Sequence, residues 1–428
     1  MSRRCTLVSL CAWALLSAYA YASGPDEWIQ WRGPNRDGIS TDTGLMKSWS
    51  EEGPPLKWKA TGLGDGFSGV SVSHGKIFTM GDRDKSEYVI CLNEADGKEV
   101  WSTKIGGPTD GGGYHGPRCV PAIDGDRIYA LGGNGELACL ATADGKEIWT
   151  KDFKKDFKGK MMSGWGFSES PLVDGDWLVC TPGGKEDGMV ALDKKTGAVV
   201  WTSKIEIPGN KGQDGAGYAS IVISHGAGVK QYVQLMGRGV VGVRAKDGKQ
   251  LWSYNKIANG TANIPTVLVK DNYVFTSTGY GDGGSALLKL SPGENGGVEM
   301  HEEYYLGAKD LQNHHGGMVM LGDYIYGGHG HSNGFPFCLE WKTGKVLYNH
   351  DRGPGRESAA VAYADGLFYF RYQDGTMALM ELDPKGFKVI SKFKIPDVQK
   401  PSWPHPVIIG GHMYLREQDA LYCYDVKG

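Results

Sequence analysis

The sequence has no strong excess of charge of either sign. Its 46 Lys and Arg residues nearly balance its 49 Asp and Glu residues, which gives a formal net charge of -3. A nucleic-acid partner is therefore not expected, because such partners are bound through basic surfaces. The sequence also lacks a Pro/Ser-rich linker, a block of like charges and, beyond its first residues, any long apolar run. These absences predict a single folded domain with no transmembrane segment.

The first residues are the exception, because they have the composition of a secretory signal. Two arginines precede an apolar run from Cys5 to Ala18, and small residues follow at Ala20 and Ala22. The run is too short to span a membrane as a helix. We predict a signal peptide over residues 1–22, cleaved before Ser23, and export to the periplasm or cell envelope. A lipid anchor at Cys11 is not favoured, because Leu10 is a poor residue at such a processing site. Losing the two arginines changes the net charge from -3 to -5.

A glycine followed four residues later by tryptophan recurs along the chain. It occurs as Gly97 with Trp101, Gly145 with Trp149, Gly197 with Trp201, and Gly248 with Trp252. The tryptophans are 48, 52 and 51 residues apart. The same spacing continues through Gly296 with Met300, Gly344 with Tyr348, and Gly386 with Ile390, although the aromatic residue is not always kept. Units of this length, each with a tight turn and an outer strand, indicate blades or coils.

The two ends of the chain complete one further unit. The last strand-like run, Leu421 to Lys427, reaches a turn glycine at Gly428, and a lone strand of the missing type surrounds Trp58. A sheet built from both ends closes a ring and leaves no open edge. A second set of turns such as Asp124-Gly125 precedes β-rich runs in each unit. We therefore predict an all-β, eight-bladed propeller of four-stranded antiparallel blades over residues 53–428, after a lead-in segment over residues 23–52. A β-solenoid and a WD-type propeller fit the period and the dipeptides less well.

Six cysteines remain after the predicted cleavage. Cys91, Cys139 and Cys338 lie ten residues before the aromatic position of their units, where other units carry Ala191, Gly242 and Leu290. Equivalent positions in neighbouring blades are about 10 Å apart, which is beyond disulfide reach. The cysteines are therefore expected to be buried free thiols.

The unusual residues of the sequence collect in the longer connections between blades. In a propeller these connections share one face, and the tight hairpins lie on the other. Loops on a rigid scaffold are where binding groups are usually carried. The candidates for ligand or cofactor binding at the channel mouth are Arg118, Trp165, Glu169, Tyr218, Asn263, His315, Arg356, Glu357, Trp403 and His405. Phe67, Tyr114 and Asn313 lie in the same connections. This mixture suits a polar ligand pocket, although a water-filled channel accounts for it equally.

Four histidines gather in the sixth unit. His314 and His315 open its inner strand, and His329 and His331 lie in a glycine-rich stretch on the same face. Alternation along an extended segment would place His329 and His331 on one side, which suits a divalent transition metal. Glycines on every side also suit a structural hydrogen-bonding corner, so both interpretations stay open.

The repeat core Ala-Asp-Gly-Lys-Glu-x-Trp, at residues 95–101 and 143–149, resembles the pyrroloquinoline-quinone (PQQ) repeat of exported bacterial β-propellers. The resemblance covers about residues 53–428, and the lead-in Trp28 to Pro34 is similar to that of many envelope proteins of this group. It implies the propeller fold. It is compatible both with BamB-like assembly scaffolds, which are not enzymes, and with quinoprotein alcohol dehydrogenases.

The dehydrogenase reading implies PQQ stacked on Trp165 or Trp403, with Arg118 or Arg356 facing its carboxylates. It also implies calcium held by Glu169 and Asn263, and an aspartate base. The sequence departs from those enzymes, because it has no adjacent cysteine pair, no large insertions and no evident aspartate base. We therefore expect a monomeric binding protein that takes a small-molecule ligand or an envelope protein partner through its long-loop face. A PQQ-dependent oxidoreductase is the alternative. A sensor or polysaccharide-binding module is also compatible with the aromatic loops.

Overall fold

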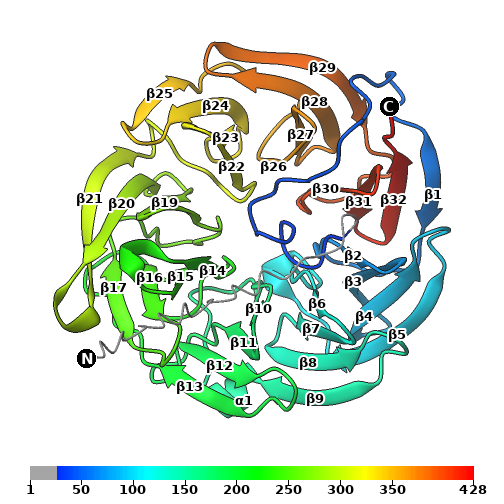
Figure 1. The fold of residues 1–428 in the computed structure, drawn as a ribbon. Coiled ribbons are helices and arrows are strands. Elements are labelled where there is room, and N and C mark those ends of the chain that lie inside the picture. The colour runs from blue at the N-terminus through cyan, green and yellow to red at the C-terminus, as the bar shows by residue number, and fades with distance from the viewer. Residues whose placement is uncertain (1–26) are drawn as a thin grey trace, which may run out of the picture.

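The structure, a computed structural model that describes residues 27–428, is a ring of eight four-stranded antiparallel sheets (Figure 1). Within each sheet the strands follow one another in order from the channel outward. The predicted fold class is therefore confirmed. The predicted signal peptide lies outside the described residues. No helix within residues 27–428 is long and apolar enough to cross a membrane.

Seven blades are built from consecutive strands. Blade 1 contains β2 (Ser71–Ser73), β3 (Lys76–Arg83), β4 (Ser86–Asn93) and β5 (Glu99–Gly106); blade 2 contains β6 (Ala122–Asp124), β7 (Arg127–Leu131), β8 (Glu136–Ala141) and β9 (Glu147–Asp152); blade 3 contains β10 (Leu172–Asp174), β11 (Trp177–Cys180), β12 (Met189–Asp193) and β13 (Val199–Ser203). Blade 4 contains β14 (Val222–Ser224), β15 (Gln231–Met236), β16 (Gly239–Arg244) and β17 (Gln250–Tyr254); blade 5 contains β18 (Leu268–Lys270), β19 (Tyr273–Thr278), β20 (Gly284–Pro292) and β21 (Val298–Gly307). Blade 6 contains β22 (Met318–Leu321), β23 (Tyr324–His329), β24 (Phe335–Glu340) and β25 (Lys345–Tyr348); blade 7 contains β26 (Ala359–Ala364), β27 (Leu367–Tyr372), β28 (Thr376–Asp383) and β29 (Gly386–Lys394).

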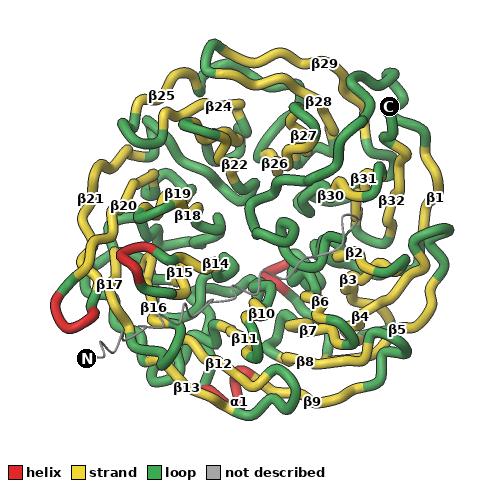
Figure 2. The backbone as a smooth tube through the Cα atoms, in the orientation of Figure 1, coloured by secondary structure: helices red, strands yellow, loops and turns green. Residues whose placement is uncertain are grey.

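Blade 8 closes the ring from both ends of the chain. It joins β30 (Val407–Ile409), β31 (His412–Glu417) and β32 (Ala420–Asp425) to β1 (Leu56–Ala60), which pairs antiparallel with β32. Trp58 lies opposite Cys423 in this pair. Helices are few (Figure 2): α1 (Phe153–Phe157) and three short 3-10 turns at Gly111–Gly113, Gly226–Gly228 and Glu294–Gly296. The closure predicted from the orphan strand around Trp58 is confirmed.

Four outer-strand tryptophans tie their blades to the next one: Trp58, Trp101, Trp149 and Trp201. The Trp101 indole lies over Gly145, where an added Cβ would come within 2.4 Å of the ring, and its N–H donates to Thr142 O at 3.2 Å. Gly145 has φ of +71°, so glycine also relieves the left-handed backbone. The ring of Trp58 covers Gly97 in the same way, across the closure of the ring. At these four positions the repeated Gly and Trp therefore meet between blades. Trp252 is the exception, because its ring lies against Gly242 of its own blade and its N–H donates to Gln231 Oε1 at 2.6 Å.

The spacing rule fails at two units, for a structural reason. The hairpin between β20 and β21 is longer than the others, so Tyr304, not Met300, takes the aromatic position opposite Leu287. Its hydroxyl donates to Trp341 O at 2.6 Å, and its ring covers Gly344. In blade 7, Ser391 and not Ile390 takes the corresponding place, opposite Leu379. The predicted equivalence of Leu290 with Cys91 is wrong for the same reason, since Leu287 is the equivalent residue.

The main apolar clusters lie between neighbouring blades. One cluster joins Phe78 and Cys91 of blade 1 to Tyr129 of blade 2 and Leu178 of blade 3. All six cysteines within the described residues are buried and free, as predicted: Cys91, Cys119, Cys139, Cys180, Cys338 and Cys423. The thiols fill space in these layers, in keeping with the behaviour of cysteine as a small apolar residue.

The described part of the lead-in, residues 27–52, begins beside inner strand β2, crosses the centre of the ring and runs outward to its edge, as the dark blue stretch of Figure 1 shows. It bonds to inner strands around the ring: Trp28 N to Val72 O at 2.9 Å, Ile123 N to Ile29 O at 2.8 Å, and Ser40 N to Tyr363 O at 2.8 Å. The buried Arg36 guanidinium donates to the carbonyls of Ser170, Pro171 and Ile221. The lead-in therefore fills the central channel.

Candidate functional site: a central pocket on the long-loop face

A cavity of about 330 Å³ lies at the centre of the ring, among the connections between blades. We call this side the long-loop face; the connections on it are residues 61–70, 107–121, 153–171, 204–221, 255–267, 308–317, 349–358 and 395–406. All of them except 349–358 contribute to the lining. The middle hairpins of blades 5, 6 and 7 add Tyr280, His331 and Gln373. Trp31 and Arg32 of the lead-in also line the cavity, so the segment that fills the channel forms part of the pocket wall.

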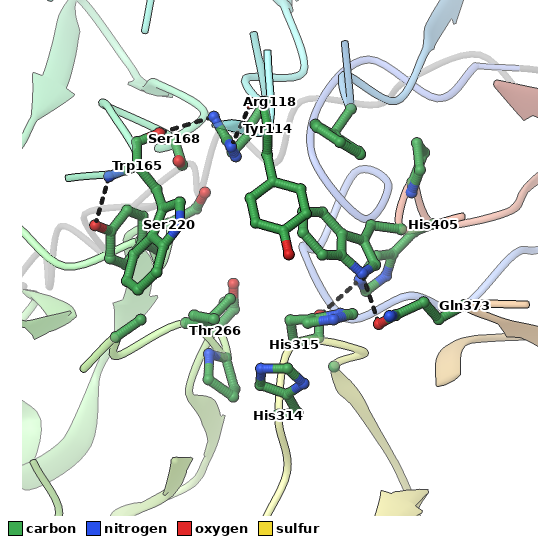
Figure 3. Close-up of a pocket in the computed structure, with 18 of the residues that line it drawn as sticks. Tyr114, Arg118, Trp165, Ser168, Ser220, Thr266, His314, His315, Gln373 and His405 are labelled. Carbon is green, nitrogen blue, oxygen red and sulfur yellow. Dashed lines mark hydrogen bonds between the residues drawn. The ribbon is translucent and has the colours of Figure 1, made fainter. Parts of the chain in front are cut away.

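The walls are mostly aromatic. Trp403 lies 4.6 Å from Phe67 and 4.9 Å from Tyr114, as distances between ring centroids. Trp165 lies 5.9 Å from Tyr218. Figure 3 shows Trp165 on one side of the pocket, His315 and His405 on the other, and Tyr114 with Arg118 between them at one end. Ring faces and edges thus surround an open space, an arrangement that suits a flat or apolar ligand.

Arg118 is held rigidly by backbone carbonyls. Its guanidinium donates to Trp165 O at 2.7 Å, Tyr114 O at 2.9 Å and Gly116 O at 3.3 Å, and it lies 5.4 Å from the centre of the Phe67 ring. Burial lowers the pKa of Arg118 to about 10, so it stays charged at neutral pH.

Three histidines meet at the opposite end from Arg118. The His314 ring lies 4.3 Å from His315 and 4.5 Å from His331, with Tyr280 at 4.7 Å. Burial lowers the pKa of His315 to about 4 and that of His314 further, so both are neutral at pH 7. Neutral imidazoles offer one donor and one acceptor each. His314 Nδ1 already meets Ser358 Oγ at 2.7 Å.

The predicted cluster of four imidazoles is not assembled. His329 ends β23, and its Nδ1 accepts from Gln312 N at 3.2 Å, whereas His331 follows a turn at Gly330 with φ of +89°. The two residues therefore do not share one extended segment, as the alternation argument required. Within residues 27–428, no three or more His, Cys, Asp and Glu side chains form a group that could hold a metal ion.

Six of the ten predicted site residues line the pocket: Arg118, Trp165, Tyr218, His315, Trp403 and His405. Glu169 and Asn263 do not. Each neighbours a lining residue but points the other way, as successive side chains do along extended backbone. Glu169 accepts from Thr181 N at 2.9 Å, and Asn263 donates to the carbonyls of Met236 and Gly237.

The last two predicted residues, Arg356 and Glu357, are exposed outside the pocket. The preceding glycines explain this, because Gly353 and Gly355 lie against Tyr372, where any Cβ would overlap its ring. The connection is thus pressed onto blade 7 and away from the channel. The sequence analysis missed Trp31, Arg32, Tyr280, Thr266 and Gln373. Tyr280 and Gln373 sit in the hairpins that correspond to the one carrying His331, so the repeat itself could have identified them.

A calcium-bound quinone does not fit these residues. No carboxylate lines the pocket within the described chain, whereas calcium requires several oxygen ligands, usually with carboxylates among them. Burial raises the pKa of Glu169 to about 8, so the predicted calcium ligand is protonated at neutral pH as well as turned away.

Three solved structures similar to this one show how widely the fold is used. BamB from Moraxella catarrhalis matches with a TM-score of 0.56 and 14% identity, over 84% of this chain and 94% of that one. A europium-containing methanol dehydrogenase matches with a TM-score of 0.62 and 13% identity, over 92% and 90%. Quinohemoprotein alcohol dehydrogenase from Comamonas testosteroni matches with a TM-score of 0.62 and 12% identity, over 96% and 82%. At these identities the likeness concerns the fold alone.

Sequence comparison gives a narrower result. No curated protein matches the chain. Residues 85–350, more than half of the chain, match the family model described as outer membrane protein assembly factor BamB. The match begins in blade 1 and runs through blade 6, so it covers the repeats that carry the Gly and Trp pairs. The chain therefore belongs to the family of β-propeller proteins represented by outer membrane protein assembly factor BamB.

Proposed function

We propose that the protein is exported and binds a small-molecule ligand in the central pocket of its long-loop face. The observation that carries this proposal is the concave, largely aromatic pocket at the centre of the ring. About 330 Å³ of space is lined by residues of seven connections, many of them aromatic, and bounded by the lead-in. Cavities of this size and lining are typical of ligand sites.

The pocket suits a small molecule better than a protein surface. A protein partner needs a broad patch of roughly 800 Å² on each side. Here the half-buried rings of Trp165 and Trp403 line a cavity, and Tyr114, which is exposed, lies among its lining residues. Export is supported by the sequence of residues 1–22, and membership of an envelope protein family agrees with it.

Ligand capture tests this proposal. The chain from Ser23 to Gly428 would be incubated with small-molecule extracts of cell envelopes and the retained compounds identified by native mass spectrometry. Trp403→Ala should abolish retention, because Trp403 packs on both Phe67 and Tyr114 in the wall. Trp177→Ala is the matched control, since that indole begins β11 on the tight-hairpin side. Retention that is unchanged in Trp403→Ala, or lost equally in both variants, would contradict the proposal.

The oxidoreductase alternative has its own test. The same protein would be mixed with PQQ and calcium and assayed for dye-linked oxidation of primary and secondary alcohols. From the absence of carboxylates in the lining, we expect no calcium-dependent turnover. Stoichiometric cofactor binding with turnover would mean that this pocket is a catalytic site and not only a ligand-binding site.

A further inference from the structure

The pocket has an unbalanced charge. Two arginines, Arg118 and Arg32, line it, and no Asp or Glu does so within the described residues. Three of the lining histidines do not add to the positive charge, because burial holds the pKa of His315 at about 4 and those of His314 and His405 well below their usual range. Neither do they cancel it. The lining thus contains two guanidiniums and, within the described residues, no carboxylate to balance them.

Arg118 is positioned without being neutralised. Its three protein partners are backbone carbonyls, and within residues 27–428 it forms no ion pair with a carboxylate. Carbonyls fix the plane of the guanidinium, but they leave its full charge beside the cavity. Asp82 and Glu87 act on Arg118 electrostatically without pairing with it, so the guanidinium stays open to an anion that enters the space.

Arg32 repeats this condition from the lead-in. Its Nη2 donates to Asp37 O at 2.8 Å and to Met318 O, whereas its Nε and Nη1 have no hydrogen-bond partner among the described residues. The Asp37 carboxylate interacts electrostatically with Arg32, but it accepts a hydrogen bond from Ile39 N at 3.0 Å and none from these two nitrogens. Buried N–H donors of a charged group are costly when unpaired. Because these two nitrogens are enclosed by protein, Arg32 acts on an anion in the pocket through its charge, and direct hydrogen bonds are left to Arg118.

The body of the ligand is indicated by the remaining walls. Carbohydrate hydroxyls need many planar polar side chains. Among the described residues the only side-chain amide in the lining is Gln373, and its Oε1 already accepts from Trp403 Nε1 at 2.8 Å. The facing surfaces are rings, with Trp165 across the pocket from His315 and His405 in Figure 3. Ring faces and edges pack best against another ring.

We infer that the pocket binds an aromatic monocarboxylate, with the ring between the aromatic walls and the carboxylate directed to Arg118. This inference rests on the proposed function, since it names the class of ligand for the same pocket. The Arg118 guanidinium supplies charge-assisted hydrogen bonds, which are the strong class for a carboxylate. Arg32 adds its charge from the lead-in, which forms part of the pocket wall.

Isothermal titration with matched probes tests the charge and the ring separately. Benzoate and trans-cinnamate should bind, and their neutral counterparts benzamide and cinnamamide should bind about 10- to 100-fold more weakly. Cyclohexanecarboxylate, glucuronate and inorganic phosphate keep a negative charge but lack the aromatic ring, so all three should also be weaker than benzoate. If the amides bind as tightly as the acids, or glucuronate binds more tightly than benzoate, the inference is wrong.

Variants of Arg118 assign the effect to one side chain. Arg118→Gln should lose about 10- to 100-fold in affinity for benzoate but not for benzamide, and Arg118→Lys should keep part of it. Arg244→Gln is the control, because Arg244 pairs with Asp247 on an outer hairpin away from the pocket. A thermal unfolding midpoint for each variant separates lost contacts from misfolding, and Arg118→Lys carries the test if Arg118→Gln does not fold.

The failure of this inference is distinguishable from failure of the proposed function. Binding of neutral aromatic compounds with no preference for acids would overturn the inference and leave ligand binding in place. Equal benzoate affinity in folded Arg118→Gln and wild type would also overturn it. If none of the probes binds and envelope extracts leave nothing on the protein, both proposals are wrong.

Discussion

Replacing Gly145 by alanine should weaken the contact between blades 1 and 2. Two costs add at this position. The backbone has φ of +71°, which costs an alanine about 1 to 2 kcal/mol. The new Cβ would also stand 2.4 Å from Trp101 Cε3 and 2.5 Å from Thr103 Oγ1, far inside contact distance. Overpacking of this kind costs about 1 to 3 kcal/mol. We expect a total loss of about 2 to 5 kcal/mol in the free energy of unfolding.

A second glycine in the same blade isolates the overlap from the backbone strain. Gly125 has φ of +59°, but an added Cβ there would meet nothing within 4 Å. Gly125→Ala should therefore lose only about 1 to 2 kcal/mol. Gly197 and Gly175 repeat the comparison in blade 3, because Gly197 lies under the Trp149 ring and Gly175 is open.

Urea unfolding followed by both tryptophan fluorescence and far-UV circular dichroism measures these differences. Coincident transitions with equal slopes would allow the midpoints to be compared as free energies. If Gly145→Ala and Gly125→Ala were equally destabilised, the ring over the glycine would contribute nothing, and the role of the Gly and Trp pairs in joining neighbouring blades would be refuted.

Three other predictions concern single contacts. Tyr304→Phe removes the hydroxyl that donates to Trp341 O, so it should lose about 1 kcal/mol in urea unfolding, whereas a larger loss would mean that the ring itself had moved. Burial raises the pKa of Glu169 to about 8, so the free energy of unfolding of the wild type should fall as pH rises from about 4.5 to about 8. Glu169→Gln should make that fall shallower. A variant with the same pH profile as the wild type would contradict the burial argument. Arg36→Gln removes the charged donors to the carbonyls of Ser170, Pro171 and Ile221. Limited proteolysis with mass spectrometry should then show faster cleavage within residues 27–50 and an intact propeller. Equal cleavage rates in the variant and the wild type would contradict the anchoring role of Arg36.

The repeat was predictable because each tie between blades needs a glycine and a ring at a fixed separation. That separation changes only where a hairpin lengthens, as it does between β20 and β21, where Tyr304 replaces Met300. Sequence spacing cannot reveal such a change, because Gly296 still keeps its place four residues before Met300. In the structure nothing lies within 4 Å of the Cβ position of Gly296, so that glycine serves only its own turn.

The site was predictable to the level of the face and no further. Connections were correctly expected to form the pocket, but which side chain of each connection faces inward depends on single-residue alternation. Glu169 and Asn263 were placed one residue out of phase, next to Ser168 and Ala262, which do line the pocket. Arg356 and Glu357 lie outside the pocket because Gly353 and Gly355 pack against Tyr372, and no local sequence pattern predicts that contact.

The largest omission was the lead-in, and it changes how the pocket has to be understood. A bare propeller channel is open at both ends, so polar residues around it can simply face water. In this protein Arg36 bonds carbonyls of blades 3 and 4, and Trp31 Nε1 donates to Thr266 Oγ1 at 3.0 Å before blade 5. Trp31 and Arg32 of this anchored segment line the cavity, so the shape of the pocket depends on the lead-in being docked. Any ligand that contacts Arg32 must stabilise the docked lead-in, because binding to one state of a segment shifts its equilibrium toward that state. If benzoate slows the proteolysis of residues 27–50, that protection would therefore report occupancy of the pocket independently of isothermal titration.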